Sequence, residues 1–329
     1  MKRKVSTFIE KWPLKKPFII SRSARTETST ITVSIQDGIH LGWGECVPNI
    51  RYGESIDSTI EQMKTIEREL SDGLNREELN DIMPAGTARN AIDCALWDLD
   101  AKLAEKDVGT MNDLDWPVDV ETVQTISILS PQKMYEEAQA LAGFPIIKVK
   151  MNSEQVLERI RAVHAGAPNS RLLIDANESW TIELLKQVTP DLADLNVKMI
   201  EQPLHADDDQ TLIGYHSQLP IFADESCHLA SDLPALKNKY QGINIKLDKT
   251  GGLTEAIALE KAAYRQGYQI MVGCMLSTSL GIAPVLFVAR RAQFVDIDAP
   301  ALLEKDRKHG IQINQGKAST LNPLLWGGS

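Results

Sequence analysis

Several kinds of segment are missing from this sequence, and each absence excludes a class of protein. No run of about 18 apolar residues occurs, so no membrane-spanning helix is expected. The basic first residues are not followed by an apolar stretch of signal-peptide length, which predicts a cytoplasmic protein. The cysteines form no C-x-x-C pair, so we expect free thiols and no zinc site at Cys46, Cys94, Cys227 and Cys274.

Positive charge is also scarce. There are 35 Lys and Arg against 45 Asp and Glu, a formal net charge of −10, and no long basic run offers the footprint that nucleic acid requires. The sequence contains no G-x-G-x-x-G, and Gly316-Lys317 lacks the other residues of a P-loop. Neither nucleic acid nor a nucleotide is therefore expected as a partner, and the composition leaves a homo-oligomer open.

What the sequence does contain is a series of short apolar runs that each end in a charged residue. Five of them read IIKVK, LLIDAN, KMIEQP, IFADES and INIKLD. Their charged ends recur about every 25 residues, the length of one strand, one helix and two short loops. The five ends are Lys150, Asp175, Glu201, Asp224 and Lys246.

Three more runs extend the series to eight predicted strands. VQTISIL places Thr125 in the equivalent position, QIMVGC follows the five, and FVDIDAP carries Asp296 and Asp298 on what we expect to be the last strand. Helical periodicity separates the runs at 154–165, 182–195, 232–240 and 253–266. Eight strands alternating with helices predict an α/β fold, a (β/α) barrel.

The length of 329 residues fits such a barrel together with a second domain. Residues 1–116 predict an α+β cap, with strands at 5–10 and 30–36, a GWGEC turn region and a helix at 88–104. Two polar segments of this cap, 21–29 and 48–55, are expected to be mobile loops. We place the barrel at 117–300, and the segment 301–329 lacks another strand and helix pair.

The strand ends predict a metal site. Catalytic groups of such barrels gather at the carboxyl ends of the strands, so Asp175, Glu201 and Asp224 should converge there. Three neighbouring carboxylates repel one another unless a cation compensates them, and Mg²⁺, one per subunit, prefers oxygen ligands of this kind. Asn177 and Glu225 lie next to these ligands and are expected to orient carboxylates or a metal-bound water.

Two lysines, Lys150 and Lys246, flank the predicted metal from opposite sides of the ring. Lys148 and Lys150 alternate with apolar residues and therefore point inward, and Lys246 lies four strands away. One neutral amine could remove a proton α to a carboxylate while a protonated amine on the other face returns one. The metal would stabilise the enolate formed in between. Plain ion pairs are the simpler interpretation of each residue taken alone.

The motifs KVK, DAN, EQP, ADES and KLDKTGG resemble those of the enolase superfamily over nearly the whole chain. Two lysine bases resemble the muconate lactonizing enzyme subgroup, and DID at 296–298 resembles its dipeptide epimerases. The resemblance implies a modified TIM barrel, (β/α)7β, whose C-terminal segment returns to an α+β cap. It also implies cap loops that cover the substrate.

The resemblance implies a function as well. It points to a dipeptide epimerase, an isomerase that inverts the C-terminal residue of L-Ala-L-Glu by two-base 1,1-proton transfer in cell-wall peptide recycling. Arg25 would meet the glutamate side chain, although Arg22 or Arg51 could take that place. Lys148 and Thr125 are assigned to substrate binding, and Asp296 and Asp298 to the ammonium group.

Other functions remain open from the sequence. An o-succinylbenzoate synthase or a muconate cycloisomerase of the same subgroup would use the same lysines and metal on substrates that have no ammonium group. A Schiff-base aldolase would use a barrel lysine without a metal. A non-catalytic barrel would not need its metal and lysine positions filled, and all of them are filled.

Overall fold

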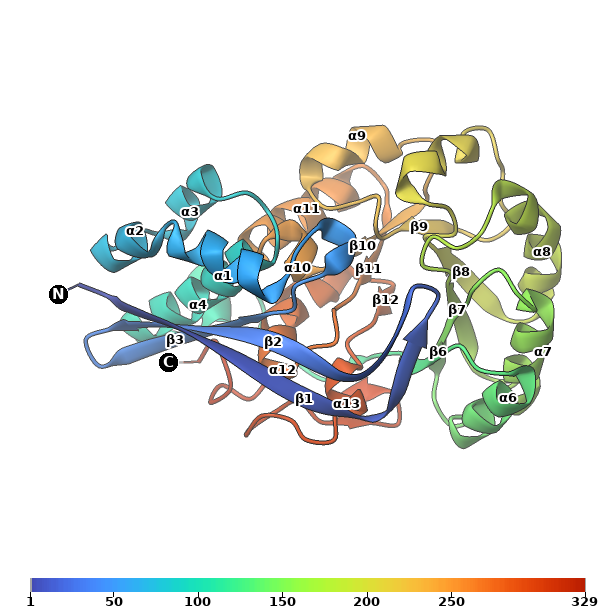
Figure 1. The fold of residues 1–329 in the computed structure, drawn as a ribbon, viewed down its shortest axis with the longest axis horizontal. Coiled ribbons are helices and arrows are strands. Elements are labelled where there is room, and N and C mark those ends of the chain that lie inside the picture. The colour runs from blue at the N-terminus through green and yellow to red at the C-terminus, as the bar shows by residue number, and fades with distance from the viewer. Residues whose placement is uncertain (1, 329) are drawn as a thin grey trace.

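The computed structural model describes residues 2–328 and joins an N-terminal cap to a parallel barrel (Figure 1). The cap contains an antiparallel sheet in the order β1-β2-β3, covered by helices. Its elements are β1 (Lys4–Ile20), β2 (Ser23–Asp37), β3 (His40–Cys46), η1 (Ile50–Tyr52), α1 (Ile56–Lys64), α2 (Glu67–Asp72), α3 (Arg76–Ile82), α4 (Thr87–Leu103) and α5 (Val108–Asn112).

The cap strands are longer than the sequence predicts. Segments 5–10 and 30–36 lie within β1 and β2, but most of the polar segment 21–29 also belongs to β2 and is not a loop. Phe18 pairs with Arg25 and Ile20 with Ser23, so β1 and β2 form a hairpin up to a tight turn. This hairpin curves over the strands of the barrel (Figure 1).

The GWGEC segment is a strand and not the predicted turn. It lies in β3, which packs directly on α4, the helix predicted at 88–104. A Cβ atom at Gly44 would lie 2.0 Å from the carbonyl oxygen of Ala91, and one at Gly42 would lie 2.2 Å from that of Ala95. The glycines are therefore needed for a close approach of strand and helix, and not for a turn.

Eight parallel strands follow in sequential order, which confirms the predicted barrel. The first and last strands meet where the Val123 N–H donates to the Val295 carbonyl (3.0 Å), so the ring closes. The strands are β5 (Gln124–Ile126), β6 (Ile146–Lys150), β7 (Arg171–Asp175), β8 (Val197–Glu201), β9 (Ile221–Ala223), β10 (Gly242–Ile245), β11 (Gln269–Val272) and β12 (Phe294–Val295).

Helices and short helical turns connect the strands around the outside. They are α6 (Pro131–Ala140), α7 (Val156–Gly166), α8 (Ile182–Asp194), η2 (Ala206–Leu212), η3 (Ala230–Asp232), α9 (Leu233–Leu236), α10 (Leu247–Thr250), α11 (Leu253–Arg265), α12 (Ser279–Ile282), η4 (Ala283–Arg291) and α13 (Ala299–Leu302). Three predicted helices match α7, α8 and α11 within two residues. The prediction at 232–240 is wrong because Lys237 is extended and Asn238 is left-handed (φ 69°), which ends α9 after one turn.

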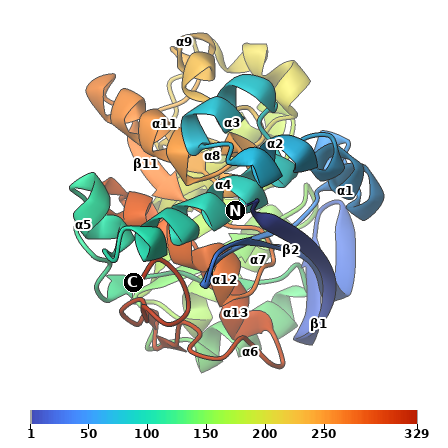
Figure 2. The same ribbon diagram turned by 90° about the vertical axis from the view of Figure 1, so that its left-hand side faces the viewer.

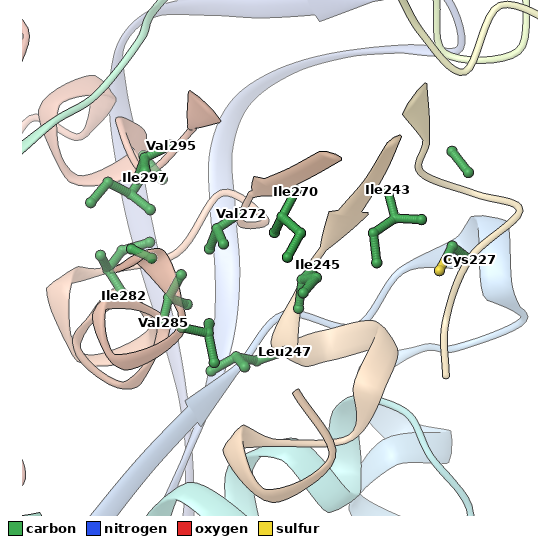
Figure 3. Close-up of a cluster of buried hydrophobic side chains, with 14 of the residues drawn as sticks. Cys227, Ile243, Ile245, Leu247, Ile270, Val272, Ile282, Val285, Val295 and Ile297 are labelled. Carbon is green, nitrogen blue, oxygen red and sulfur yellow. The ribbon is translucent and has the colours of Figure 1, made fainter. Parts of the chain in front are cut away.

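Strand side chains alternate between two separate cores. One set points outward to the helices, and Figure 3 shows Ile245 and Val272 facing Ile282 and Val285 of α12 and η4. The other set fills the barrel interior near the amino ends of the strands, where it forms a small apolar cluster of Val123, Ile146, Leu173, Met199, Phe222, Met271 and Phe294. Inward positions nearer the carboxyl ends of the strands therefore lie above a dry apolar floor.

The last residues lie against the cap (Figure 2). A small sheet of β4 (Val120–Glu121), β13 (Ile313–Asn314) and β14 (Lys317–Ala318) leads to this end. The Trp326 indole N–H donates to the carbonyl oxygens of Trp43 (2.9 Å) and Cys94 (3.1 Å). Within residues 2–328, no helix has the length and apolar character to cross a bilayer. The domain boundaries at 116 and 300 stay predictions.

The close packing of β3 on α4 leads to a test of stability. We expect Gly44→Ala to lower the free energy of unfolding by about 1–3 kcal/mol, because strand and helix must separate to admit the methyl group. Gly143→Ala is the control, since a Cβ atom there meets nothing within 4 Å, and it should change stability by less than about 0.5 kcal/mol. Urea unfolding measures both variants, and equal stabilities would contradict the packing argument.

Candidate active site at the carboxyl ends of the barrel strands

The charged residues predicted from the strand ends come together above the apolar floor. Lys150, Asp175 and Glu201 are the last residues of β6, β7 and β8, and Asp224 and Lys246 directly follow β9 and β10. Each side chain is buried, with the lysines 8% and 7% exposed and the carboxylates at most 1%. The strand register fixes this arrangement, since Lys150 pairs with Asp175 and Asp175 with Glu201.

Lys148 lies one layer deeper and holds three carboxylates. Its Nζ is 2.6 Å from Asp296 Oδ2, 2.7 Å from Glu201 Oε2 and 3.1 Å from Asp175 Oδ2. Burial alone lowers the pKa of Lys148, but these carboxylates raise it well above its ordinary value. The side chain is 1% exposed and does not line the cavity described below, so its predicted contact with substrate stays a prediction.

The two remaining inward lysines face a common cavity from opposite sides. Lys150 Nζ lies 2.6 Å from Asp175 Oδ2, and Lys246 Nζ lies 2.5 Å from Asp224 Oδ2. Both side chains line a cavity of about 320 Å³, and β6 and β10 are four strands apart in the ring of eight. Lys249 supports the second pair, because its Nζ lies 2.7 Å from Asp224 Oδ1.

The carboxylates differ in how strongly they hold their protons. Burial raises the pKa of Asp175, but Lys150 and Lys148 outweigh it and hold the pKa below its ordinary value. The pKa of Asp224 is likewise lowered, by its two lysine partners against burial. For Glu201, burial and repulsion from Asp175 prevail over Lys148 and raise the pKa to about 7.

The neighbouring carboxylates set the charge state of Lys246. Burial lowers the pKa of Lys246, and so does Lys148, but Asp224 and Glu201 raise it further, so the net shift is upward. The carboxylates therefore keep this lysine protonated as the structure stands.

The oxygen atoms of the cluster fit a hard divalent cation. Within residues 2–328 no three His, Cys, Asp or Glu side chains form a ready metal site, because lysine ammonium groups lie between the carboxylates. Several buried oxygens nevertheless accept no hydrogen bond, namely Asn177 Oδ1, Glu225 Oε2 and Glu201 Oε2, the last of which has only its ion pair. An all-oxygen set with unused lone pairs is the kind that Mg²⁺ binds.

The residues predicted beside the ligands also contact the cap. The Asn177 backbone N–H donates to Asp175 Oδ1 (3.0 Å), and the Asn177 carbonyl accepts from Arg22 Nη1 (2.8 Å). Glu225 Oε1 accepts from Arg22 Nη2 (2.7 Å). Arg51 makes two hydrogen bonds to Glu178, of 2.6 and 2.7 Å. The cap is thus tied to the strand ends by two arginines.

These ion pairs separate Arg25 from the two arginines that the sequence left as alternatives. Arg22 and Arg51 are committed to Glu178 and Glu225. Arg25 is half-buried and lines the cavity, and it makes no ion pair or side-chain hydrogen bond with any other residue in 2–328. Of the three, Arg25 is the one whose guanidinium makes no ion pair within residues 2–328.

Asp296 and Asp298 line the cavity, but they do not lie on the last strand, because β12 ends at Val295. Asp296 Oδ2 pairs with Lys148, while Asp298 Oδ2 accepts from the backbone N–H of Thr125 (2.6 Å). Burial and repulsion from Asp296 raise the pKa of Asp298 to about 7. One oxygen of each carboxylate is therefore already engaged, and Thr125 contributes a backbone donor at this wall.

Two groups of site residues escaped the sequence reasoning. Asn244 donates from Nδ2 to Glu201 Oε1 (2.6 Å), and its position two residues before Lys246 could have revealed it by strand alternation. The apolar walls have no such signal, because they come from the cap and from loops far apart in sequence. They include Phe18, Ile20, Tyr52, Met275, Leu276 and Leu302.

Comparison with known proteins matches both parts of the chain. Residues 2–111 match the mandelate racemase / muconate lactonizing enzyme N-terminal domain, and residues 133–319 match the enolase C-terminal domain-like family. The L-Ala-D/L-Glu epimerase of Escherichia coli (strain K12) is 44% identical over 317 residues, 96% of this chain and 99% of that protein. An N-acetyl-D-glutamate racemase from Pseudoalteromonas is 42% identical, over 91% of this chain and 95% of that protein.

Solved structures share the fold along the whole chain. An enolase family member from Agrobacterium tumefaciens with homology to dipeptide epimerases, with bound sodium and L-Ala-L-Glu, is 41% identical with a TM-score of 0.96, covering 99% of this chain and 100% of that one. The dipeptide epimerase of Enterococcus faecalis, complexed with Mg and L-Leu-L-Tyr, is 28% identical with a TM-score of 0.90, covering 97% of each chain.

The pKa of Glu201 predicts how metal binding depends on pH. Because that pKa is raised to about 7, a proton competes with the cation below pH 7 and not above it. Mg²⁺ affinity should therefore fall by up to about tenfold per pH unit as the pH drops from 7 to 6, and change less steeply from 7.5 to 8.5.

Calorimetric titration with Mg²⁺ in two buffers of different ionisation enthalpy measures both the affinity and the protons released. About one proton should be released per ion at pH 6.5 or below. An affinity that does not change between pH 6 and 8 would contradict the assignment.

Proposed function

Because this chain belongs to the enolase superfamily, in its mandelate racemase and muconate lactonizing enzyme group, we propose that it is a Mg²⁺-dependent dipeptide epimerase. It inverts the α-carbon of the C-terminal residue of a dipeptide of the L-Ala-L-Glu type. The observation that carries the proposal is the pair of ammonium groups, Lys150 and Lys246, on opposite walls of one cavity that has carboxylates at its base. The names of the relatives support the same activity.

Asp175, Glu201 and Asp224 would hold the Mg²⁺ ion, with Asn177 and Glu225 beside them. The ion, when bound, would stabilise negative charge that develops on the substrate carboxylate. Lys148 compensates the charge of Asp175 and Glu201 from below, while Lys246 and Lys249 compensate that of Asp224. Asn244 fixes the orientation of Glu201 through its hydrogen bond to Oε1.

Lys150 and Lys246 carry out the proton transfers. A dipeptide in the cavity has its α-carbon between the two amines, so one faces the hydrogen of the L epimer and the other that of the D epimer. The neutral amine on one face removes the α-proton, and the ammonium on the other face returns a proton to the same carbon. The reverse reaction exchanges the two roles, and no atom is gained or lost overall.

Other residues that line the cavity select the substrate. Arg25 has no partner within residues 2–328 and would bind the glutamate side-chain carboxylate through a charge-assisted hydrogen bond. Asp296, Asp298 and the Thr125 backbone form the wall where the N-terminal ammonium group would lie. A dipeptide with an acidic C-terminal residue thus has a partner for each of its charges.

A second candidate substrate is an N-acylated glutamate. It is favoured by the 42% identity to an N-acetyl-D-glutamate racemase and by the pairing of Asp296 with Lys148 and of Asp298 with Thr125, which leaves less negative charge for an ammonium group. Both candidates share the glutamate α-carbon and side chain and differ only at the nitrogen. Comparing kcat/KM for α-proton exchange in L-Ala-L-Glu and N-acetyl-L-glutamate decides between them.

The cellular setting rests on the resemblance alone. An Ala-Glu epimerase suits the recycling of cell-wall peptides in the cytoplasm, and we include that role in the proposal.

The two-base arrangement predicts a stereochemical signature in single lysine variants. In ²H₂O with Mg²⁺, Lys150→Ala should exchange the α-proton of one epimer of Ala-Glu only, and Lys246→Ala that of the opposite epimer only, because each variant keeps one base. Epimerisation itself should fall by about 100-fold or more in both. Mass spectrometry of each epimer measures the exchange.

Lys102→Ala is the control for the lysine variants, since Lys102 pairs with Asp98 in the cap and should leave both exchanges intact. Exchange of both epimers by either site variant would contradict the two-base assignment. If the unaltered protein exchanged the α-proton of neither candidate substrate, that result would contradict the proposed function.

The availability of Arg25 predicts a specific loss of selectivity. Arg25→Met should lower kcat/KM for Ala-Glu by about 10–100-fold, the range of one hydrogen bond to a charged group, mainly through KM. For Ala-Gln, which lacks the side-chain charge, the loss should be several-fold smaller. Equal losses on the two dipeptides would mean that Arg25 only supports the fold of the hairpin.

A further inference from the structure

Gln202 follows Glu201 directly, and its side chain binds the segment that follows β9. Its side chain is fully buried, and its Oε1 accepts from the backbone N–H groups of Asp224 (2.9 Å) and Ser226 (3.1 Å). Its Nε2 lies 2.9 Å from each of three acceptors, the Leu204 carbonyl and the hydroxyls of Ser226 and Tyr240, which share its two N–H groups. The amide is thus bonded on both sides.

The backbone of Gln202 adds a second tie between the strands. Its N–H donates to the Phe222 carbonyl (2.8 Å), which extends the pairing of β8 with β9 beyond Glu201. Its φ of 34° is a left-handed value that costs a residue with a side chain about 1 kcal/mol or more. Such a conformation persists only where surrounding contacts hold it, and the bonds to the amide do so.

A polar network outside the barrel supports the far end of the amide. The Tyr240 hydroxyl accepts from Gln202 and donates to Asp209 Oδ2 (3.1 Å), and Asp209 Oδ1 lies 2.6 Å from Lys239 Nζ. Asp209 and Lys239 are both buried, so this network lies in a low-dielectric region where its bonds are strong. A continuous chain therefore runs from Lys239 to the backbone of Asp224.

We propose that Gln202 is a positioning residue that fixes Asp224 relative to Glu201 and so sets the affinity of the site for Mg²⁺. The inference rests on the proposed function, since it takes both carboxylates as metal ligands. It goes further by placing their relative position under the control of one amide that touches neither metal nor substrate. Lys246 depends on the same residue, because its ammonium pairs with Asp224.

An amide is the group that this position requires. Gln202 uses its oxygen to accept from two N–H groups, and the two N–H groups of its nitrogen are shared among three oxygens. A glutamate keeps the acceptor and loses the donors, whereas a methionine of similar size loses both. The two substitutions therefore separate the hydrogen bond that Oε1 accepts from the Asp224 N–H from the hydrogen bond of Nε2 with Tyr240.

The test measures Mg²⁺ dissociation constants by calorimetric titration at pH 8. Gln202→Met should weaken Mg²⁺ binding by about 10-fold or more, the range for a residue that orients a ligand, and Gln202→Glu should recover at least a third of the lost affinity. Tyr240→Phe should weaken binding by less than Gln202→Met, because the amide keeps two of its three acceptors. Thermal unfolding and circular dichroism show that each variant is folded.

Ser170→Ala is the matched control, since it removes one buried hydrogen bond, to the Phe144 carbonyl (2.7 Å), at the opposite end of β7. It should leave the Mg²⁺ dissociation constant within twofold. A folded Gln202→Met variant that binds Mg²⁺ as tightly as the unaltered protein would overturn the inference, and so would equal losses in Gln202→Met and Ser170→Ala. Failure of the unaltered protein to bind Mg²⁺ would instead remove the proposed function.

Discussion

The need to compensate buried charge governs this structure. Asp175, Glu201 and Asp224 are buried in the barrel above an apolar floor, and isolated charges there would cost several kcal/mol each. The same strand ends therefore carry Lys148, Lys150 and Lys246, and the two kinds of charge interleave. Several of these groups have more than one partner, since Asp175 pairs with both Lys148 and Lys150 and Asp224 with both Lys246 and Lys249.

Interleaving has a chemical consequence. The same pairing that stabilises the acids keeps Lys148 and Lys246 protonated, whereas proton abstraction requires a neutral amine. A cation among the carboxylates would shift this balance, which links metal binding to the protonation of the bases. Among Asp175, Glu201 and Asp224, only Glu201 has a raised pKa, so the lysines compensate its charge less than that of the other two. Charge balance thus connects the stability of the barrel to the proposed reaction.

The cap completes the site because it is tied to the same strand ends. Arg22 and Arg51 bridge the cap to Glu178 and Glu225, which follow β7 and β9. Arg307 from the C-terminal segment binds Glu45 and Glu10 of the cap sheet, and Glu45 in turn accepts from Thr278 in the loop after β11. The walls and the base of the cavity are therefore held together by ion pairs that cross the domain boundary.

The sequence by itself determined the barrel, its family and the charged strand ends. Period-two alternation and a repeat of about 25 residues are local properties of the sequence. They place Lys150, Asp175 and Lys246 on one side of their strands independently of the tertiary contacts. Only the tertiary structure decided which groups pair with each other. Gln202, the apolar walls and the role of GWGEC depend on contacts between segments that are distant in sequence or on different strands. A single chain carries no periodic signal for such contacts, because they arise when the cap closes on the barrel and the strands set their register.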